Sequence, residues 1–304
     1  MTTTLPIDHD GAVRRRTVVA SGMSATTLYR AVTAGALERI GSGLYVPVGA
    51  VAPEARHRLM LGDVTSSAAV VLSHESAAVV HGLPMLKPDL RDVHVTVPQE
   101  TQRVRGNLRR VHVAELGADE VAEVGGHTVT VLERTAVDVA AAAPLRFAGA
   151  LAVFDAALRR GAQPAVLAVL VRNRGSGVLR RALACASPLA DGVGESWCRA
   201  QLLAAGLPRP RLKHPVVDTG GEVLAEPDMN WRHRVLGEFD GTARYQRIRV
   251  KGDSNLSAAW RAIARDDKLR ARGVRVLRWT WTDLERRDVA VACRFLLGRR
   301  GLLC

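Results

Sequence analysis

The chain has 304 residues, of which 47% are hydrophobic and only 4% aromatic, so its cores consist mostly of Ala, Val and Leu. Lys and Arg outnumber Asp and Glu by 13, a balance that favours polyanionic partners, nucleic acid first. No apolar run approaches the roughly 18 residues of a membrane span, and the N-terminus lacks a signal-peptide core. We therefore expect a cytoplasmic protein of two or three domains with no membrane partner.

Residues 1–50 are predicted to form a small DNA-binding domain. A helical stretch ends at Gly22, Ser24 is a good N-cap for a second helix over 25–34, and a Gly-Ser-Gly turn joins two short strands. This order is typical of a winged helix-turn-helix, whose second helix enters the major groove. The alternative is a small helical cap with a hairpin. The candidate DNA contacts are Thr26, Thr27, Arg30, Arg39 and Ser42.

The segment SGMSATTLYRAVTAGALERIGSGLYV resembles the N-terminal winged-helix domain of the AbiEi family, the antitoxins of type IV toxin–antitoxin systems. The patterns SHESAAVVHGLP, VHVTVP, RTAVDVA and ALAVFDAALR are similar to the middle portion of AbiEi-type actinobacterial proteins. This resemblance implies binding to DNA at the protein's own promoter and a cognate toxin protein as partner. It does not supply a chemistry.

Residues 51–185 are predicted to form a mixed α/β middle domain. The pattern predicts strands over 92–97, 108–113 and 127–132, followed by a long Ala-rich helical region. His74 and His81 are seven residues apart and share a helical face, but two histidines without a third ligand favour a structural role over a metal site. Asp138 and Asp155 are placed to pair with Arg134 and Arg159 through contacts four residues apart.

The last third contains three acids that could lie close together. In the strand predicted over 234–240, Glu238 and Asp240 share one face, and Asp228 belongs to a neighbouring strand predicted over 222–229. Two acids on a mostly apolar strand cost folding energy unless a cation is held there, so a divalent metal is one candidate. The alternative is a solvated strand end that leads into the turn Asp240-Gly241.

Residues 192–285 resemble the very-short-patch-repair-like branch of the PD-(D/E)XK endonuclease superfamily, through GESWCRAQLLAAGLPRPRL, VVDTGGEVLAEPDMNWRHRVLGEFDG and DDKLRARGVRVLRWTW. The resemblance implies a restriction-endonuclease-like α/β sandwich over 186–304. Carried over by position, Glu195 is the helix acid, Asp228 and Glu238 are the metal-ligating acids, and Asp240 stands where that superfamily has Lys. Hard carboxylate oxygens suit Mg²⁺ or Mn²⁺.

Because Asp240 stands in place of that Lys, another residue would have to supply the cation of such a site. Lys268, on the following helix, is the first choice, with Lys213 and Lys251 as alternatives. His214 and His233 are candidate general bases, although a lone histidine is more often structural. Three arginines of a basic segment are predicted to hold the DNA backbone: Arg244, Arg247 and Arg249.

The sequence thus predicts a multidomain α/β (α+β) protein with boundaries near residues 50 and 185. Two functions remain open at this point. The first is a DNA-binding protein whose metal-dependent endonuclease domain hydrolyses DNA phosphodiesters. The second is a non-catalytic AbiEi-like antitoxin that acts as a transcriptional autorepressor of a toxin–antitoxin system.

Overall fold

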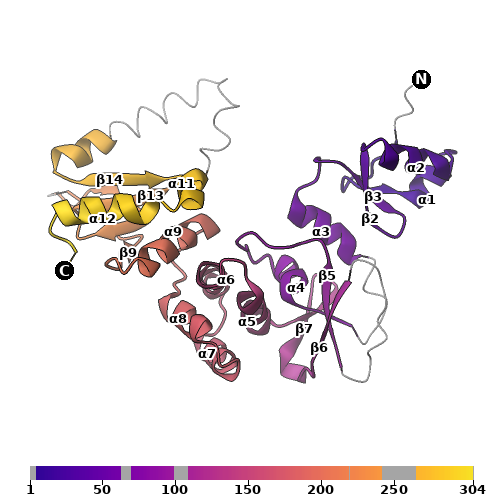
Figure 1. Ribbon diagram of the computed structural model, residues 1–304, viewed down its shortest axis with the longest axis horizontal. Coiled ribbons are helices and arrows are strands. Elements are labelled where there is room, and N and C mark those ends of the chain that lie inside the picture. The colour runs from indigo at the N-terminus through magenta and orange to yellow at the C-terminus, as the bar shows by residue number, and fades with distance from the viewer. Residues whose placement is uncertain (1–4, 63–69, 99–108, 219, 242–264, 304) are drawn as a thin grey trace. The chain divides into compact units, whose positions relative to one another are not determined.

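The computed structural model describes residues 5–62, 70–98, 109–218, 220–241 and 265–303 (Figure 1). By its internal contacts the chain forms an N-terminal unit, residues 1–83 with 88–139, and a C-terminal unit, residues 84–87 with 140–304. The three domains predicted from the sequence stay a prediction. The predicted contacts Arg244, Arg247 and Arg249, and also Lys251, lie outside the described residues. No helix within the described ranges combines the length and apolar character that a membrane crossing requires.

The N-terminal unit begins with the predicted order of two helices and a hairpin. Its elements are β1 Val13–Arg14, α1 Arg15–Ala20, α2 Ala25–Thr33, β2 Leu37–Gly41 and β3 Leu44–Pro47, and the strands form a sheet in the order β1-β3-β2. The Ser24 hydroxyl accepts a hydrogen bond from the Thr26 N–H at 3.2 Å, which satisfies one of the unpaired donors at the start of α2. Val18 and Leu28 are buried between the helices and the sheet.

Ion pairs of Arg14 with two aspartates stabilise the start of this region. The Arg14 guanidinium lies 2.5 Å from both Asp8 Oδ2 and Asp10 Oδ2. Its hydrogen bond lowers the pKa of Asp10 from 3.8 to about 2. A carboxyl whose pKa is lower in the folded state stabilises the fold above its unfolded pKa, and that contribution is lost as the pH falls through the folded pKa.

We therefore expect Asp10→Asn to melt below the wild type at pH 6, and the difference to shrink below about pH 4 as the wild-type carboxyl takes up its proton. Thermal melts followed by far-ultraviolet circular dichroism measure the difference. The matched control is Asp119→Asn, because Asp119 is exposed. A gap between Asp10→Asn and wild type that is equally large at pH 6 and pH 2.5 contradicts the assignment.

The rest of the N-terminal unit is a five-stranded mixed sheet with helices. Its elements are α3 Pro53–Leu61, β4 Val71–Leu72, α4 His74–His81, β5 Val93–Val97, β6 Arg109–Val113, the short 3₁₀ helix η2 Ala118–Glu120, β7 Val121–Val124, β8 His127–Thr130 and α5 Leu132–Ala142. The strand order is β6-β5-β4-β8-β7, with β5/β6 and β4/β8 parallel. The three strands predicted here are confirmed. Strand β4, with two residues, and β7, with four, were not predicted, because so few residues show little alternation of polar and apolar side chains.

One core joins the hairpin to this sheet. Ile40, Leu44 and Val46 of the hairpin belong to the same buried cluster as Leu61 and Val95. The first fifty residues therefore pack against the sheet that follows them in the chain.

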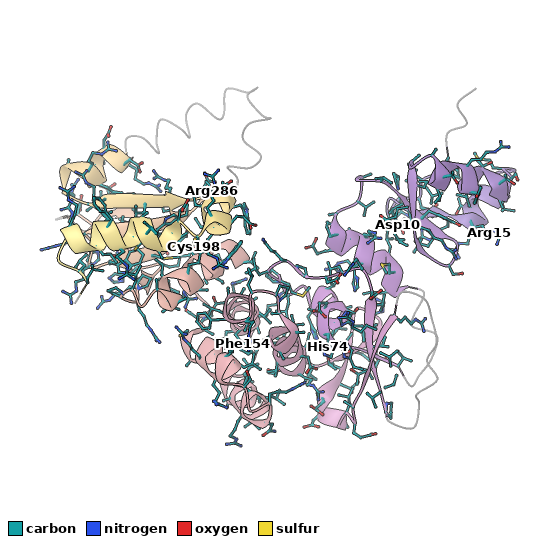
Figure 2. All side chains as sticks on the ribbon, in the orientation of Figure 1. Asp10, Arg15, His74, Phe154, Cys198 and Arg286 are labelled. Atoms are coloured by element: carbon teal, nitrogen blue, oxygen red, sulfur yellow. The ribbon has the colours of Figure 1, made fainter. Side chains whose placement is uncertain are left out.

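The C-terminal unit starts with a bundle of alanine-rich helices: α6 Phe147–Arg159, α7 Pro164–Asn173, α8 Gly177–Cys185 and α9 Val193–Ala204. Phe154 of α6 and Cys198 of α9 are completely buried (Figure 2).

One of the two predicted ion pairs is present. The predicted pairing of Asp138 with Arg134, both in α5 of the N-terminal unit, is confirmed at 2.8 Å. The predicted partner of Asp155 was wrong: this buried carboxylate binds Arg199 at 2.7 Å.

The remaining elements are β9 Arg211–Leu212, β10 Val216–Val217, β11 Val223–Ala225, β12 Met229–Trp231, β13 Val235–Phe239, a helix over 265–271, β14 Arg275–Trp279, α11 Trp281–Arg286 and α12 Val289–Arg299. They form a hairpin of β10 and β11 and a sheet in the order β14-β13-β12-β9, in which β13 and β14 are parallel.

The strand predicted over 222–229 is in fact two strands in different sheets. The break falls at Pro227, which has no N–H to give to a ladder. Strand β13 is covered on both faces. Leu236 packs with Leu269 and Val274 on one side. On the other side, a Cβ added to Gly237 would lie 2.6 Å from the Trp279 ring, so only glycine fits there.

Candidate functional site

Helix α2 presents a row of polar side chains to solvent. Thr26 and Arg30 are exposed, Tyr29 is 73% exposed, and Thr27 is half-buried, while Leu28 points into the core. With side chains, a helix such as α2 is about 10–12 Å in diameter, which fits a major groove about 12 Å wide. Three of the predicted DNA contacts therefore lie on one helix, with Thr27 the least accessible of them.

Arginines of α1 and the β2–β3 hairpin flank this row. Arg15 (Figure 2) and Arg16 are exposed on α1, and Arg39 and Ser42 are exposed on the hairpin. A hollow of about 930 Å³ lies against α1 and the hairpin turn, and a second of about 400 Å³ lies between α2 and the hairpin. The first is lined in part by Arg14, Arg15, Arg16 and Ser42, and the second by Tyr29, Arg39 and Ser42 among others.

Sequence reasoning missed Arg15, Arg16 and Tyr29 as members of this surface. A run of three arginines at 14–16 was the available signal for the first two. Arg14 is different because its guanidinium is committed to Asp8 and Asp10. We call Arg15, Arg16, Tyr29, Arg30 and Arg39 the basic face.

Two of the acids predicted for a nuclease site, Glu195 and Asp228, lie in the C-terminal unit close to Lys213. The Lys213 Nζ atom is 2.6 Å from Asp228 Oδ1, 3.4 Å from Glu195 Oε2 and 2.8 Å from Asp191 Oδ2. Burial and the nearby charge of Asp228 raise the pKa of Glu195. Burial opposes the charge of Lys213, but its bonds to Asp191 and Asp228 outweigh this and raise its pKa. The ammonium therefore offsets part of the negative charge of these three carboxylates.

Glu238 belongs to a second ion-pair group. The β12–β13 register pairs Met229 with Gly237, so one step further Asp228 and Glu238 lie side by side on the same face. However, Glu238 Oε2 accepts from Arg278 Nε at 3.0 Å, and Arg265 lies 3.2 Å from Glu238 Oε1. Asp228 instead accepts from the Phe239 N–H at 2.7 Å. Two neighbouring carboxylates are thus held by different cations.

The predicted Lys268 is exposed on the helix over 265–271, whereas Lys213 makes the ion pairs with Asp228 and Glu195. The prediction that preferred Lys268 relied on chain order alone. Asp240 donates its N–H to Trp279 O at 2.8 Å, which continues the β13–β14 ladder.

Within the described ranges, the acids of this region form no set of three whose oxygens all lie within 4.8 Å of one another. The one set of three potential metal ligands that meets this distance there consists of histidines in the N-terminal unit. An ion between Asp228 and Glu238, held also by the Phe239 carbonyl, remains a prediction. For such an ion to bind, the lysine and arginine contacts of these carboxylates would have to be displaced.

Comparison with known proteins gives two findings. Residues 5–48 match the family described as "Transcriptional regulator, AbiEi antitoxin", a segment that contains α1, α2 and the hairpin. The chain is also 32% identical, over 227 residues, to the uncharacterized proteins Rv2248 and MT2308 of Mycobacterium tuberculosis strains H37Rv and CDC 1551. Each alignment covers 68% of this chain and 74% of the relative. The chain therefore belongs to the same family as these mycobacterial proteins, and its N-terminal segment is similar to that of the AbiEi antitoxin transcriptional regulators.

Proposed function

We propose that this protein is a DNA-binding transcriptional regulator of the AbiEi antitoxin type. The observation that carries the proposal is the match of residues 5–48 to that family, because the matched segment contains the whole basic face. In this proposal residues 12–47 form a winged helix-turn-helix, α2 enters the major groove and the hairpin acts as the wing.

The chemistry of the basic face supports this docking. Arg15, Arg16 and Arg39 flank α2 and suit bidentate contacts with phosphate oxygens. Thr26 on α2 carries the hydroxyl and methyl group that base edges recognise, and Arg30 on the same helix is placed to contact phosphate. The excess of 13 cationic side chains over the whole chain adds long-range attraction to DNA.

The regulatory part of the proposal follows from the antitoxin family. An autorepressor binds operator DNA upstream of its own gene, and an antitoxin has a cognate toxin as partner. Autorepression and a cognate toxin partner are therefore parts of this proposal.

The test is a fluorescence-anisotropy titration of the full chain with a labelled duplex from upstream of its own gene, beside a scrambled duplex of equal length and composition. We expect at least about 10³-fold tighter binding to the upstream duplex at 0.15 M salt, the lower end of the range for specific DNA recognition. Equal affinity for the two duplexes contradicts an autorepressor. No binding to either duplex at low salt contradicts a DNA-binding function altogether.

A second candidate function, metal-dependent DNA cleavage, is favoured by one feature of the C-terminal unit. Asp228 and Glu238 lie side by side on adjacent strands, with Glu195 nearby and Lys213 as the cation that Asp240 does not provide. In this alternative Lys213 takes the role first given to Lys268, and Asp228 and Glu238 would hold Mg²⁺ or Mn²⁺, which would supply an activated water for attack.

The cleavage assay uses supercoiled and linear plasmid with Mg²⁺ or Mn²⁺. For a nuclease we expect nicking or linearisation that Asp228→Ala, Glu238→Ala and Lys213→Met each reduce at least about 100-fold. Glu222→Gln, an exposed acid of the same unit, is the matched control. If the wild type leaves both substrates intact with either metal, the second candidate is abandoned and the regulator stands alone.

A further inference from the structure

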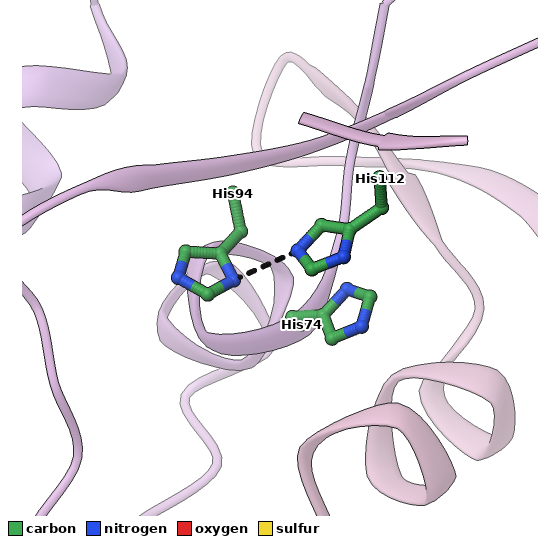
Figure 3. Close-up of side chains that lie close together, drawn as sticks. All are labelled: His74, His94 and His112. Carbon is green, nitrogen blue, oxygen red and sulfur yellow. Dashed lines mark hydrogen bonds between the residues drawn. The ribbon is translucent and has the colours of Figure 1, made fainter. Parts of the chain in front are cut away.

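Three histidines from three separate elements meet in the N-terminal unit (Figure 3). His74 is the first residue of α4, His94 is the second residue of β5, and His112 lies in the edge strand β6. One ligand nitrogen from each ring lies within 4.8 Å of the other two. His94 Nδ1 and His112 Nε2 are 3.2 Å apart, and the His74 and His112 rings stack with centroids 3.6 Å apart.

The surrounding structure orients these rings. His74 has φ = +49°, in the left-handed region that non-glycine residues rarely adopt, and its Nδ1 lies 3.0 Å from the hydroxyl of the buried Ser73. The Ser76 hydroxyl accepts a hydrogen bond from the backbone N–H of His94 at 2.7 Å, and it lies 2.9 Å from His57 Nε2. In metal sites a contact of the second ring nitrogen fixes the orientation of a histidine ligand, and here the neighbouring hydroxyls hold the histidines in place.

A buried carboxylate lies beside the three histidines. Glu75 is only 6% exposed, and its Oε2 lies 3.0 Å from His94 Nδ1. This oxygen has no hydrogen-bond partner within the described residues. Burying a carboxylate costs folding energy unless a cation balances its charge.

A single divalent ion can use one lone pair from each of the three imidazoles and balance the charge of Glu75 at the same time. We propose that His74, His94 and His112, with Glu75 beside them, bind a divalent transition-metal ion of the zinc class.

The ligand chemistry selects this class. Imidazole nitrogens suit Zn²⁺, Co²⁺ and Ni²⁺, whereas Mg²⁺ prefers oxygen ligands throughout. Zn–N bonds of about 2.0–2.1 Å place two ligands of a tetrahedral ion about 3.3 Å apart. The His94–His112 separation of 3.2 Å is close to this value. The ion would tie the edge strand β6 to β5 and to α4, and this site does not depend on the proposed DNA-binding function.

The test uses the full chain, stripped with a chelator and titrated with Co²⁺. We expect one equivalent to bind, with visible absorption of a nitrogen- and oxygen-liganded ion and no thiolate charge-transfer band, and we expect Zn²⁺ to displace it. His112→Ala should weaken Co²⁺ binding at least about tenfold and abolish the rise in melting temperature that Zn²⁺ gives the wild type. His112 is chosen because it is half-buried on an edge strand, so its removal disturbs the fold least.

Further variants locate the ion. Glu75→Gln should weaken binding about 10- to 100-fold, and His74→Ala should repeat the His112→Ala result. His9→Ala removes an exposed histidine and should bind as the wild type does. The proposal is overturned if the wild type takes up no ion, if His112→Ala with wild-type circular dichroism binds equally well, or if Asp228→Ala removes the binding. DNA affinity is measured separately, so either proposal can fail without the other.

Discussion

Replacing Arg30 and Arg39 together with alanine is expected to weaken DNA binding about 30-fold at 0.15 M salt. Both side chains are exposed on the basic face, one on α2 and one on β2. Each phosphate contact releases roughly 0.9 counterions, and at this salt concentration that contributes a factor of about five to the binding constant. Two lost contacts multiply to about 30-fold and reduce the slope of log K against log salt by about 1.8.

The measurement is fluorescence anisotropy over a salt series, with the same duplexes as for the wild type. The matched control is Arg172→Ala with Arg180→Ala, which removes two exposed arginines of α7 and α8 and lowers the net charge equally. A control that loses as much affinity as the Arg30/Arg39 variant shows that binding follows net charge and not the basic face. If the single variant Arg30→Ala loses affinity only for the upstream duplex, Arg30 contacts a base and not a phosphate.

The second large effect is expected in the C-terminal unit, where Arg199→Ala should lower the free energy of unfolding by about 3–5 kcal/mol. The Asp155 carboxylate is completely buried and accepts hydrogen bonds of 2.7 Å each from Ser187 N–H, Ser196 Oγ and Arg199 NH1. Arg199 also donates to Cys185 O at 2.6 Å. Its loss leaves a buried charge without a cation and opens the junction of α6, α8 and α9.

The pH dependence of this defect has a defined sign. Burial raises the pKa of Asp155 above its ordinary value even with Arg199 present. Without Arg199 the pKa of Asp155 rises further, so this carboxyl is protonated over a wider pH range in the folded state. The protonated carboxyl is neutral and needs no cation, and folding then takes up a proton. The deficit of Arg199→Ala is therefore expected to be largest near pH 7 and to shrink as the pH falls toward 4.

Urea unfolding followed by tryptophan fluorescence measures this effect, because all five tryptophans lie between residues 197 and 281 and report on the C-terminal unit. Arg180→Ala, an exposed arginine of α8, should stay within about 0.5 kcal/mol of the wild type. The double variant Asp155→Leu with Arg199→Met, which replaces the pair by apolar side chains, should recover most of the loss. If Arg199→Ala unfolds with the wild-type midpoint, the buried pair does not hold the unit together.

The sequence was most informative where structure is local. Capping by Ser24 and the glycines at 22 and 35 were enough to place α2 and the hairpin, since these signals act within a few residues of the chain. Alternation in DVHVTV located β5 for the same reason. Strand β12 was misplaced because a run of suitable residues does not reveal which sheet each part joins, and Pro227 divides the run.

By itself, therefore, the sequence determined the helices, the main strands, the excess of positive charge and an N-terminal segment with the order of a DNA-binding module. Only the tertiary structure decided which charges meet. It paired Asp155 with Arg199, 44 residues away, in place of the nearby Arg159. It brought Lys213 to Asp228 and Glu195 in place of Lys268. It also gathered His74 with His94 and His112 across three elements, where sequence spacing had linked His74 only to His81. Such contacts are made between elements that pack together, and packing depends on sheet order and register, which local periodicity does not encode.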